Sequence, residues 1–172
     1  MGLPRAPMRL TPSFAFSDVL RSLQECLGRR RFGREQMEQV ISFFGTTECV
    51  FCGSSHVKRW DHLVAVKNGG ETVLGNMVLA CAACDDSKQD RSHDVWLRVR
   101  AAASGSPEAV AEAERRIEKL QACSTKFGYR PVPLSERLTH EELQRLRSIE
   151  ARAVRLRKDI DDLIATFRAR TE

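Results

Sequence analysis

The sequence predicts an α+β fold in which helices at both ends of the chain flank a short central segment of strands. Near both ends, apolar residues recur at the three- and four-residue spacing of amphipathic helices. In the centre, residues 57–66 and 76–80 are rich in β-branched and aromatic or apolar residues, and the turn sequence Lys-Asn-Gly-Gly at 67–70 lies between them. Two Cys-x-x-Cys pairs bracket these stretches. A small strand pair held by cysteines is therefore expected between helical flanks.

Composition limits the class of protein further. The chain has 172 residues, a length that suits one domain or one domain with a helical extension; 42% of the residues are hydrophobic and 30% are charged. No apolar run approaches the ~18 residues needed to span a bilayer, and the first residues lack a signal-like apolar core. We therefore expect a cytoplasmic protein with no membrane partner. A net charge of +5 permits a nucleic-acid partner without requiring one.

Residues 1–45 are expected to form an N-terminal arm followed by helices. Ser17 is a possible N-cap for a short helix with an apolar face of Val19, Leu20, Leu23 and Leu27. A second helix at about 34–44 should end at Gly45. The segment 46–103 holds the two strands, and a short helix near Ala82 and another from Ser92 to about 103 should follow them.

Residues 104–172 are expected to form a helical extension. Ser106 and Pro107 favour a helix start, and Thr139 with Glu142 forms a capping box that opens a long helix to about Arg168. Between His140 and Glu172 the sequence holds eight Lys or Arg and seven Asp or Glu, a balance that favours a helix–helix contact over nucleic-acid binding. Apolar residues on this helix follow a heptad seam made of Leu146, Ile149, Ala153, Leu156, Ile160, Leu163 and Phe167. The seam can pack onto the same chain, or it can pair two chains into a two-fold homodimer through residues 139–170.

The two Cys-x-x-Cys pairs predict a metal site. Twenty-eight residues separate the pair Cys49 and Cys52 from the pair Cys81 and Cys84. Four thiolates at this spacing suit tetrahedral zinc and leave no open position for a substrate, so the zinc would be structural. A redox role is less favoured, because one pair would suffice for it. Cys26 and Cys123 have no such partner, and we expect them to be small core residues.

The residues between the cysteine pairs resemble a known family. Asp61-His62, Gly69-Gly70, Asn76 and Asp85 with Lys88 are arranged as in the HNH endonuclease motif, in its four-cysteine, zinc-stapled form. The resemblance covers residues 46–91 and implies the ββα-metal fold. By this resemblance we expect the chain to be an α+β protein with an HNH module at 46–103.

The resemblance assigns roles to individual residues. It implies that His62 is the general base, that Asp61 is a catalytic metal ligand, and that Asn76 braces the loop between the strands. Asp85 takes the place of the final metal-binding residue, with adjacent Asp86 as an alternative. Two carboxylate ligands favour Mg²⁺ or Mn²⁺ over zinc. Because alternate residues of a strand point to opposite faces, Asp61 and His62 need a bulge, a twist or a strand-edge metal to reach one phosphate.

Basic residues near this motif are the expected nucleic-acid contacts. Lys88 and Arg91 follow the last cysteine and are the first candidates for phosphate binding, and the second candidates flank the catalytic strand and loop: Lys58, Arg59 and Lys67.

The expected function is a metal-dependent endonuclease that cuts double-stranded DNA and leaves 5′-phosphate ends, with a restriction-type, site-specific role favoured. A nicking HNH enzyme of a phage or mobile element is a second possibility. A zinc module that binds nucleic acid or protein without catalysis is a third, and an interaction protein built on the C-terminal heptads is a fourth.

Overall fold

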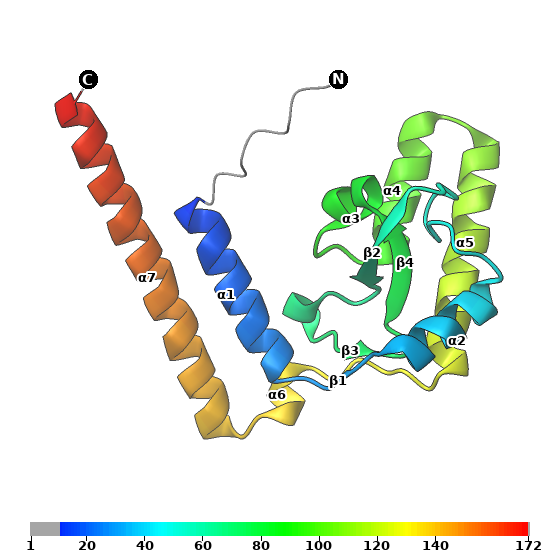
Figure 1. Ribbon diagram of the computed structural model, residues 1–172, viewed down its shortest axis with the longest axis horizontal. Coiled ribbons are helices and arrows are strands. Elements are labelled where there is room, and N and C mark those ends of the chain that lie inside the picture. The colour runs from blue at the N-terminus through cyan, green and yellow to red at the C-terminus, as the bar shows by residue number, and fades with distance from the viewer. Residues whose placement is uncertain (1–10, 172) are drawn as a thin grey trace. The chain divides into compact units, whose positions relative to one another are not determined.

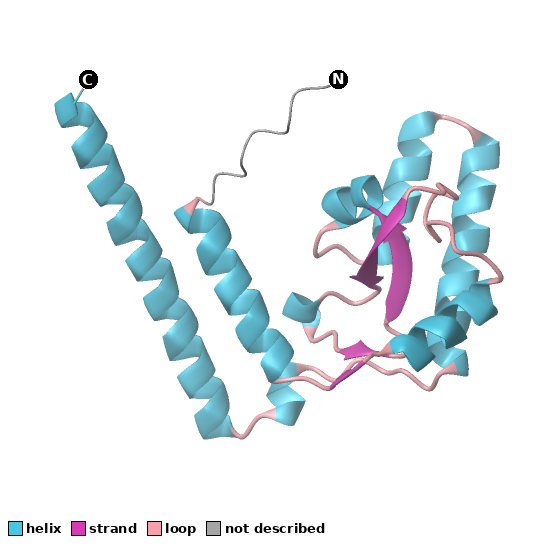
Figure 2. Cartoon of the chain, viewed as in Figure 1, coloured by secondary structure: helices cyan, strands magenta, loops and turns pink. Residues whose placement is uncertain are grey.

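The structure is a computed structural model that describes residues 11–171, with the Lys58 side chain outside the description. The chain forms two compact units. The larger unit is Gln24–Arg137, and the smaller unit combines residues up to Leu23 with residues from Leu138 onward. Helices dominate and strands are few, so the α+β expectation is confirmed (Figures 1 and 2). In chain order the elements are α1 Pro12–Cys26, β1 Arg30–Arg31, α2 Arg34–Phe44, β2 Val57–His62, the 3₁₀ turn η1 Val66–Asn68, β3 Thr72–Val73, β4 Met77–Cys81, α3 Ala82–Lys88, α4 His93–Ser104, α5 Pro107–Lys126, α6 Leu134–Arg137 and α7 His140–Thr171.

The centre of the larger unit is an antiparallel hairpin of β2 and β4 covered by α3. His62 lies opposite Met77, and Asp61 lies opposite Val78. The one irregularity of the hairpin lies between Val57 and Arg59, so the pairing runs without a shift past both Asp61 and His62. The hairpin and α3 together form a ββα unit (Figure 1).

Strand β2 is shorter than the sequence pattern predicts, because the chain turns after His62. Asn76 is fully buried and ties this turn down: its Oδ1 accepts from Val64 N at 2.8 Å, and its Nδ2 donates to Val64 O at 3.1 Å and to Glu71 O at 2.8 Å. Gly70 packs so closely on the Val64 carbonyl that an added Cβ would lie 1.7 Å from the oxygen. The Gly-Gly pair is thus required by close backbone approach.

Helix α5 belongs to the core of the larger unit. Its apolar face packs with α2, β4 and α4 through fully or nearly fully buried Ala113, Ile117, Leu120 and Cys123. The structure therefore corrects the expected division at residue 104, because α5 supplies one wall of the core. Cys123 is a core residue as expected, whereas Cys26 is exposed at the end of α1.

A second pair of strands was not foreseen from the sequence. The two-residue strands β1 and β3 pair in parallel, with Arg30 beside Thr72 and Arg31 beside Val73. Arg29 binds the buried Glu71 carboxylate at this point. Its side-chain Nη2 lies 2.7 Å from Oε2 in an ion pair, and its backbone N–H donates to Oε1 at 2.9 Å. This contact fixes the start of the larger unit to the loop that precedes Asn76.

The expected helix signals of the C-terminal part are confirmed. Ser106 accepts a hydrogen bond from Ala109 N at the start of α5. Thr139 and Glu142 bond reciprocally at the start of α7, with Thr139 N donating to the Glu142 carboxylate at 2.8 Å and Glu142 N donating to Thr139 Oγ1 at 3.3 Å. Among the described residues, no helix is long and apolar enough to cross a membrane.

The hydrogen bonds of Asn76 predict a large cost for an isosteric substitution. Asn76→Asp removes the Nδ2 donor, which leaves the Val64 carbonyl without a partner and the Glu71 carbonyl with only the Val73 N–H, and it places a carboxyl group in the interior. We expect a loss of about 3 kcal/mol in the free energy of unfolding, measured by urea denaturation. Asn68→Asp, in the same loop but exposed, is the matched control and should cost about 0.5 kcal/mol or less. Equal losses in the two variants would contradict the bracing role.

Candidate active site and metal centre

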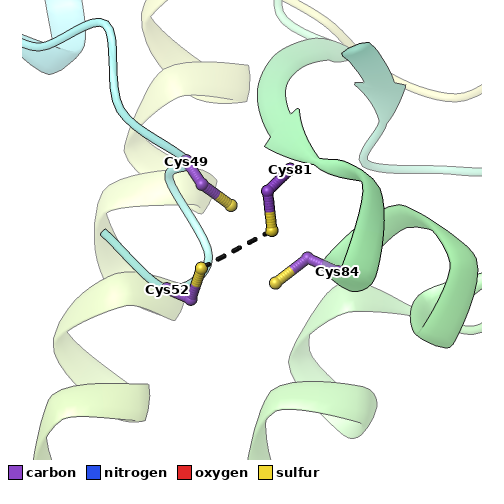
Figure 3. Close-up of side chains that lie close together, drawn as sticks. All are labelled: Cys49, Cys52, Cys81 and Cys84. Carbon is purple, nitrogen blue, oxygen red and sulfur yellow. Dashed lines mark hydrogen bonds between the residues drawn. The ribbon is translucent and has the colours of Figure 1, made fainter. Parts of the chain in front are cut away.

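The four cysteines of the two Cys-x-x-Cys pairs lie together (Figure 3). Cys49 and Cys52 belong to the loop after α2, Cys81 ends β4, and Cys84 lies in α3. The four Sγ atoms are all within 4.8 Å of one another, and the Sγ atoms of Cys52 and Cys81 are 3.7 Å apart. This cluster is able to hold a metal ion, and its donor set is the one that tetrahedral zinc prefers.

The surroundings of the sulfur atoms favour negative charge at one of them. The pKa of Cys49 is lowered to about 4, chiefly by the hydrogen bond from Cys84 and with help from the backbone hydrogen bonds of Cys81, Phe51 and Cys52, which together outweigh the effect of burial. The same hydrogen bond to Cys49, together with burial, raises the pKa of Cys84. A cation is the natural way to satisfy four crowded sulfurs, because it stabilises all four as thiolates.

Arg100 adds a positive charge beside this cluster. Its Nη1 lies 3.2 Å from Cys84 Sγ, and its guanidinium sits over the Trp96 ring at 5.5 Å from the centroid. Arg100 belongs to α4, so this contact ties α4 to the cluster. Sequence reasoning missed it, because nothing in the spacing of Arg100 from the cysteines marks a contact sixteen residues beyond Cys84.

Asp61 and His62 lie on β2 and make contacts in different places. The Asp61 carboxylate is buried against α3, where Lys88 Nζ is 3.1 Å from Oδ2 and 3.4 Å from Oδ1. The half-buried His62 places Nε2 3.0 Å from the Thr72 hydroxyl. Alternation along the strand thus holds in the fold, since no bulge separates the two residues. Thr72 is a second contact that the sequence did not reveal.

The Asp61 carboxylate has features of a cation ligand. Burial raises its pKa to about 6 despite the opposing effect of Lys88, and nearby Asp85 contributes to the rise. Its Oδ2 is buried and accepts no hydrogen bond of good geometry. A carboxylate oxygen that lacks a well-aligned hydrogen bond and lies in the field of a second carboxylate fits a hard divalent cation. Among the described residues, Asp61, Asp85 and His62 do not form a three-ligand cluster like that of the cysteines, so such a cation would rely on two carboxylates and on water or substrate oxygens.

The second expected ligand is held by an arginine. Arg59 Nη1 lies 2.7 Å from Asp85 Oδ2 and 2.5 Å from Asp86 Oδ1, and it bridges the two carboxylates at the start of α3. Both carboxylates are therefore near the hairpin, and the geometry leaves the choice between them open. Arg59 is 43% exposed at its side chain, so the pair lies at the surface and can exchange partners.

The residues expected to contact phosphate differ in their exposure and in their partners. Lys88 is a correction: its side chain is 0% exposed and pairs with Asp61, so it acts in the interior instead of on the surface. Arg91 is exposed and caps the end of α3 through the Ser87 and Lys88 carbonyls. Lys67 is exposed and lies 2.6 Å from Asp90. The Lys58 side chain lies outside the described residues.

Comparison with known proteins agrees with the resemblance seen in the sequence. The family model described as HNH endonuclease matches residues 49–91, which include both cysteine pairs and the stretch from Asp61 to Asp85. The match covers about a quarter of the chain. It confirms that this segment is an HNH segment, and it supports a function of the nuclease type. Neither curated proteins nor solved structures give a match to the chain.

The contact of Arg100 with the cluster predicts an effect on metal affinity. Arg100→Met keeps much of the side chain's bulk and removes its charge from beside Cys84. We expect about tenfold weaker zinc binding, measured by competition with a chromophoric chelator. Arg98→Met is the matched control, because Arg98 lies on the same helix and pairs with Glu114 away from the sulfurs. If the Arg98 and Arg100 variants bind zinc as the wild type does, Arg100 plays no part in the site.

The raised pKa of Asp61 predicts a pH-dependent stability. Over the interval from its ordinary value of 3.8 to about 6, the folded protein holds a proton on Asp61 that the unfolded chain has lost. The free energy of unfolding therefore falls as the pH rises through that interval, by about 3 kcal/mol for this group. Asp61→Asn does not titrate, so the difference in unfolding free energy between wild type and variant should fall by this amount, measured by urea denaturation at a series of pH values. A difference that stays constant with pH would contradict the assignment.

Proposed function

We propose that the protein is a metal-dependent DNA endonuclease of the HNH type. The observation that carries the proposal is the position of His62 and Asp61 at the end of a hairpin strand that the buried Asn76 and the cysteine cluster hold in place. Asn76 holds one end of the hairpin and the cysteine cluster holds the other, so the backbone that carries Asp61 and His62 is fixed at both ends. Such preorganisation is what a hydrolytic site needs.

His62 acts as the general base in this proposal. It accepts a proton from the water whose oxygen attacks the scissile phosphorus, and Thr72 holds the imidazole in orientation through the 3.0 Å contact. The P–O3′ bond breaks as the P–O bond to the water oxygen forms, and the departing O3′ takes a proton from solvent, which leaves a 5′-phosphate and a 3′-hydroxyl. Histidine suits this step because it titrates near neutral pH.

Asp61 and Asp85 would hold a hard divalent cation, Mg²⁺ or Mn²⁺, with Asp86 as the alternative to Asp85. When bound, such a cation polarises the phosphate and stabilises the leaving oxygen. Lys88 holds the Asp61 carboxylate in the interior and limits its rotation. Arg59 must release Asp85 for this role, and its exposed guanidinium can then pair with a DNA phosphate, as Arg91, Lys67 and Lys58 are also proposed to do.

The cysteine cluster is proposed to hold a structural zinc ion. Its chemistry requires reduced thiols, so we place the protein in the reducing cytoplasm. We also propose that the enzyme is site-specific and of the restriction type, and that two copies pair through residues 139–170, which would present two nuclease sites to the two strands of a duplex. A nicking enzyme from a phage or mobile element is the alternative biological role.

A non-catalytic zinc module that binds nucleic acid is the second candidate function. The specific observation in its favour is that arginine and lysine already neutralise both expected ligands: Lys88 pairs with Asp61, and Arg59 pairs with Asp85. In this alternative the two ion pairs would stabilise the fold, and the chain would bind DNA without cutting it.

Cleavage by the zinc-loaded protein separates the two functions. We expect wild-type protein to cut modified or unmodified plasmid and phage DNA in the presence of Mg²⁺ or Mn²⁺ and not of EDTA, as seen on a gel. His62→Ala should lower the cleavage rate at least ~100-fold while DNA affinity, from gel shift, stays within about twofold. His140→Ala is the matched control, because His140 is exposed at the start of α7.

The outcomes assign the function. DNA that binds but stays intact with every metal and substrate would overturn the nuclease proposal and favour the binding module. Equal cleavage by wild type and His62→Ala would leave a nuclease but remove His62 as the base.

A further inference from the structure

Helix α7 carries an exposed line of large apolar side chains. Ile149, Leu156 and Leu163 are 40%, 52% and 69% exposed, and they follow one another at intervals of seven residues. Residues at this spacing lie almost directly above one another on a helix, so they form one stripe along it. We call these three residues the α7 stripe. A continuous exposed apolar stripe is the mark of an interaction surface.

The other edge of the same heptad seam is already covered within the smaller unit. Leu146 is 5% exposed, and Ala153 and Ile160 are half-buried, so the seam is divided along its length. Within this unit α1 and α7 run in opposite directions (Figure 1), and the half-buried residues of α1 include Phe16, Leu20 and Leu23. Intramolecular packing therefore accounts for one edge of the seam and leaves the α7 stripe unpartnered in the described structure.

Two opposite charges lie beside the stripe. Arg152 precedes Leu156 by four residues, and Asp159 follows it by three, so both lie on the same side of the stripe at nearly equal distances along the helix. Both are exposed, and among the described residues neither takes part in a salt bridge. Their arrangement makes the stripe self-complementary for one orientation of a second copy only.

That orientation is antiparallel. A two-fold axis at Leu156 places Ile149 of each copy against Leu163 of the other, and it places Arg152 of each copy against Asp159 of the other. A parallel two-fold pair instead carries Arg152 and Asp159 of the two copies to opposite flanks of the contact, so the two residues do not meet across it. The charges therefore select the antiparallel pair, and the apolar stripe supplies its attraction.

We propose that two copies of this chain associate through an antiparallel contact of their α7 stripes, with Arg152 and Asp159 forming two symmetric ion pairs across the contact. The dimer would join two pairs of helices, each made of α1 and α7, in one helical bundle. The near balance of acidic and basic residues on α7 fits this occupant better than a nucleic acid. The contact does not depend on nuclease activity, and it can be measured without DNA.

The test is a charge-swap cycle read by sedimentation equilibrium of the full chain, zinc-loaded and free of DNA. Wild type should form a concentration-dependent dimer. Arg152→Glu alone and Asp159→Arg alone should each raise the dissociation constant about tenfold, because each creates two like-charge contacts, and the double variant should return it to near the wild-type value. Leu156→Glu should raise it roughly 100-fold by burying two charges, while circular dichroism shows an unchanged helix content.

The control is the pair Arg155→Glu and Asp162→Arg, which carries the same residue types at the same spacing, outside the stripe. These changes should leave the dimer as it is. A wild type that stays monomeric at its highest soluble concentration overturns the proposal. Single swaps without effect, or a double variant that does not recover, overturn the antiparallel arrangement even where a dimer forms.

Discussion

Four sulfur atoms within 4.8 Å of one another are the constraint on which the rest of the larger unit depends. They join the loop after α2, the end of β4 and the start of α3. Helix α3 has seven residues and is too short to be stable alone, so its position follows from the cluster and from the hairpin beneath it. Because α3 carries Asp85 and Lys88, the sulfur cluster also places the charges that surround Asp61. Arg100 extends this connection to α4 and thereby to α5, whose apolar face completes the core.

The candidate site is built from charges that neutralise one another. Lys88 is buried with Asp61, and removing either partner would leave an uncompensated charge in the interior, which is far more costly than the pair itself is stabilising. Arg59 plays the same part for Asp85 at the surface, where water screens the interaction and makes it exchangeable. The two ion pairs thus have different roles: Lys88 fixes the Asp61 carboxylate in the interior, and Arg59 pairs at the surface with the Asp85 carboxylate, which can be released. A nuclease would use both properties, since it needs a fixed ligand and an entry for the phosphate.

The smaller unit follows a different principle. Two helices side by side can bury only one stripe each, and in α7 Leu146 is the one fully buried residue. Most of the stability of a helix in a protein comes from packing of its apolar face, so the 32 residues of α7 gain little from the 15 residues of α1. An exposed apolar stripe is a costly feature for an isolated monomer, and the proposed association would remove that cost. The proposed nuclease chemistry and the proposed assembly therefore rest on separate parts of the chain.

Local signals in the sequence determined most of the helices, the caps at Ser106 and Thr139, the cysteine pairs and the order of Asp61, His62 and Asn76, because each depends on residue type and short spacing. The capping box of Thr139 and the turn at Gly69-Gly70 are of this kind, and a family resemblance added roles to the residues between the cysteines. Ser17 is an exception: it was expected to cap a helix, but it lies inside α1, which begins at Pro12. Contacts between distant residues were decided only by the tertiary structure. Lys88 looked like a surface phosphate ligand on a helix, and only the packing of α3 on β2 shows that it is buried against Asp61. Thr72 reaches His62, Arg29 reaches Glu71 and Arg100 reaches Cys84 across ten, forty-two and sixteen residues, separations over which neither periodicity nor propensity carries information. The heptads of α7 likewise identified an apolar seam, but which edge of it is covered depends on where the chain folds back, and that is a property of the three-dimensional structure alone.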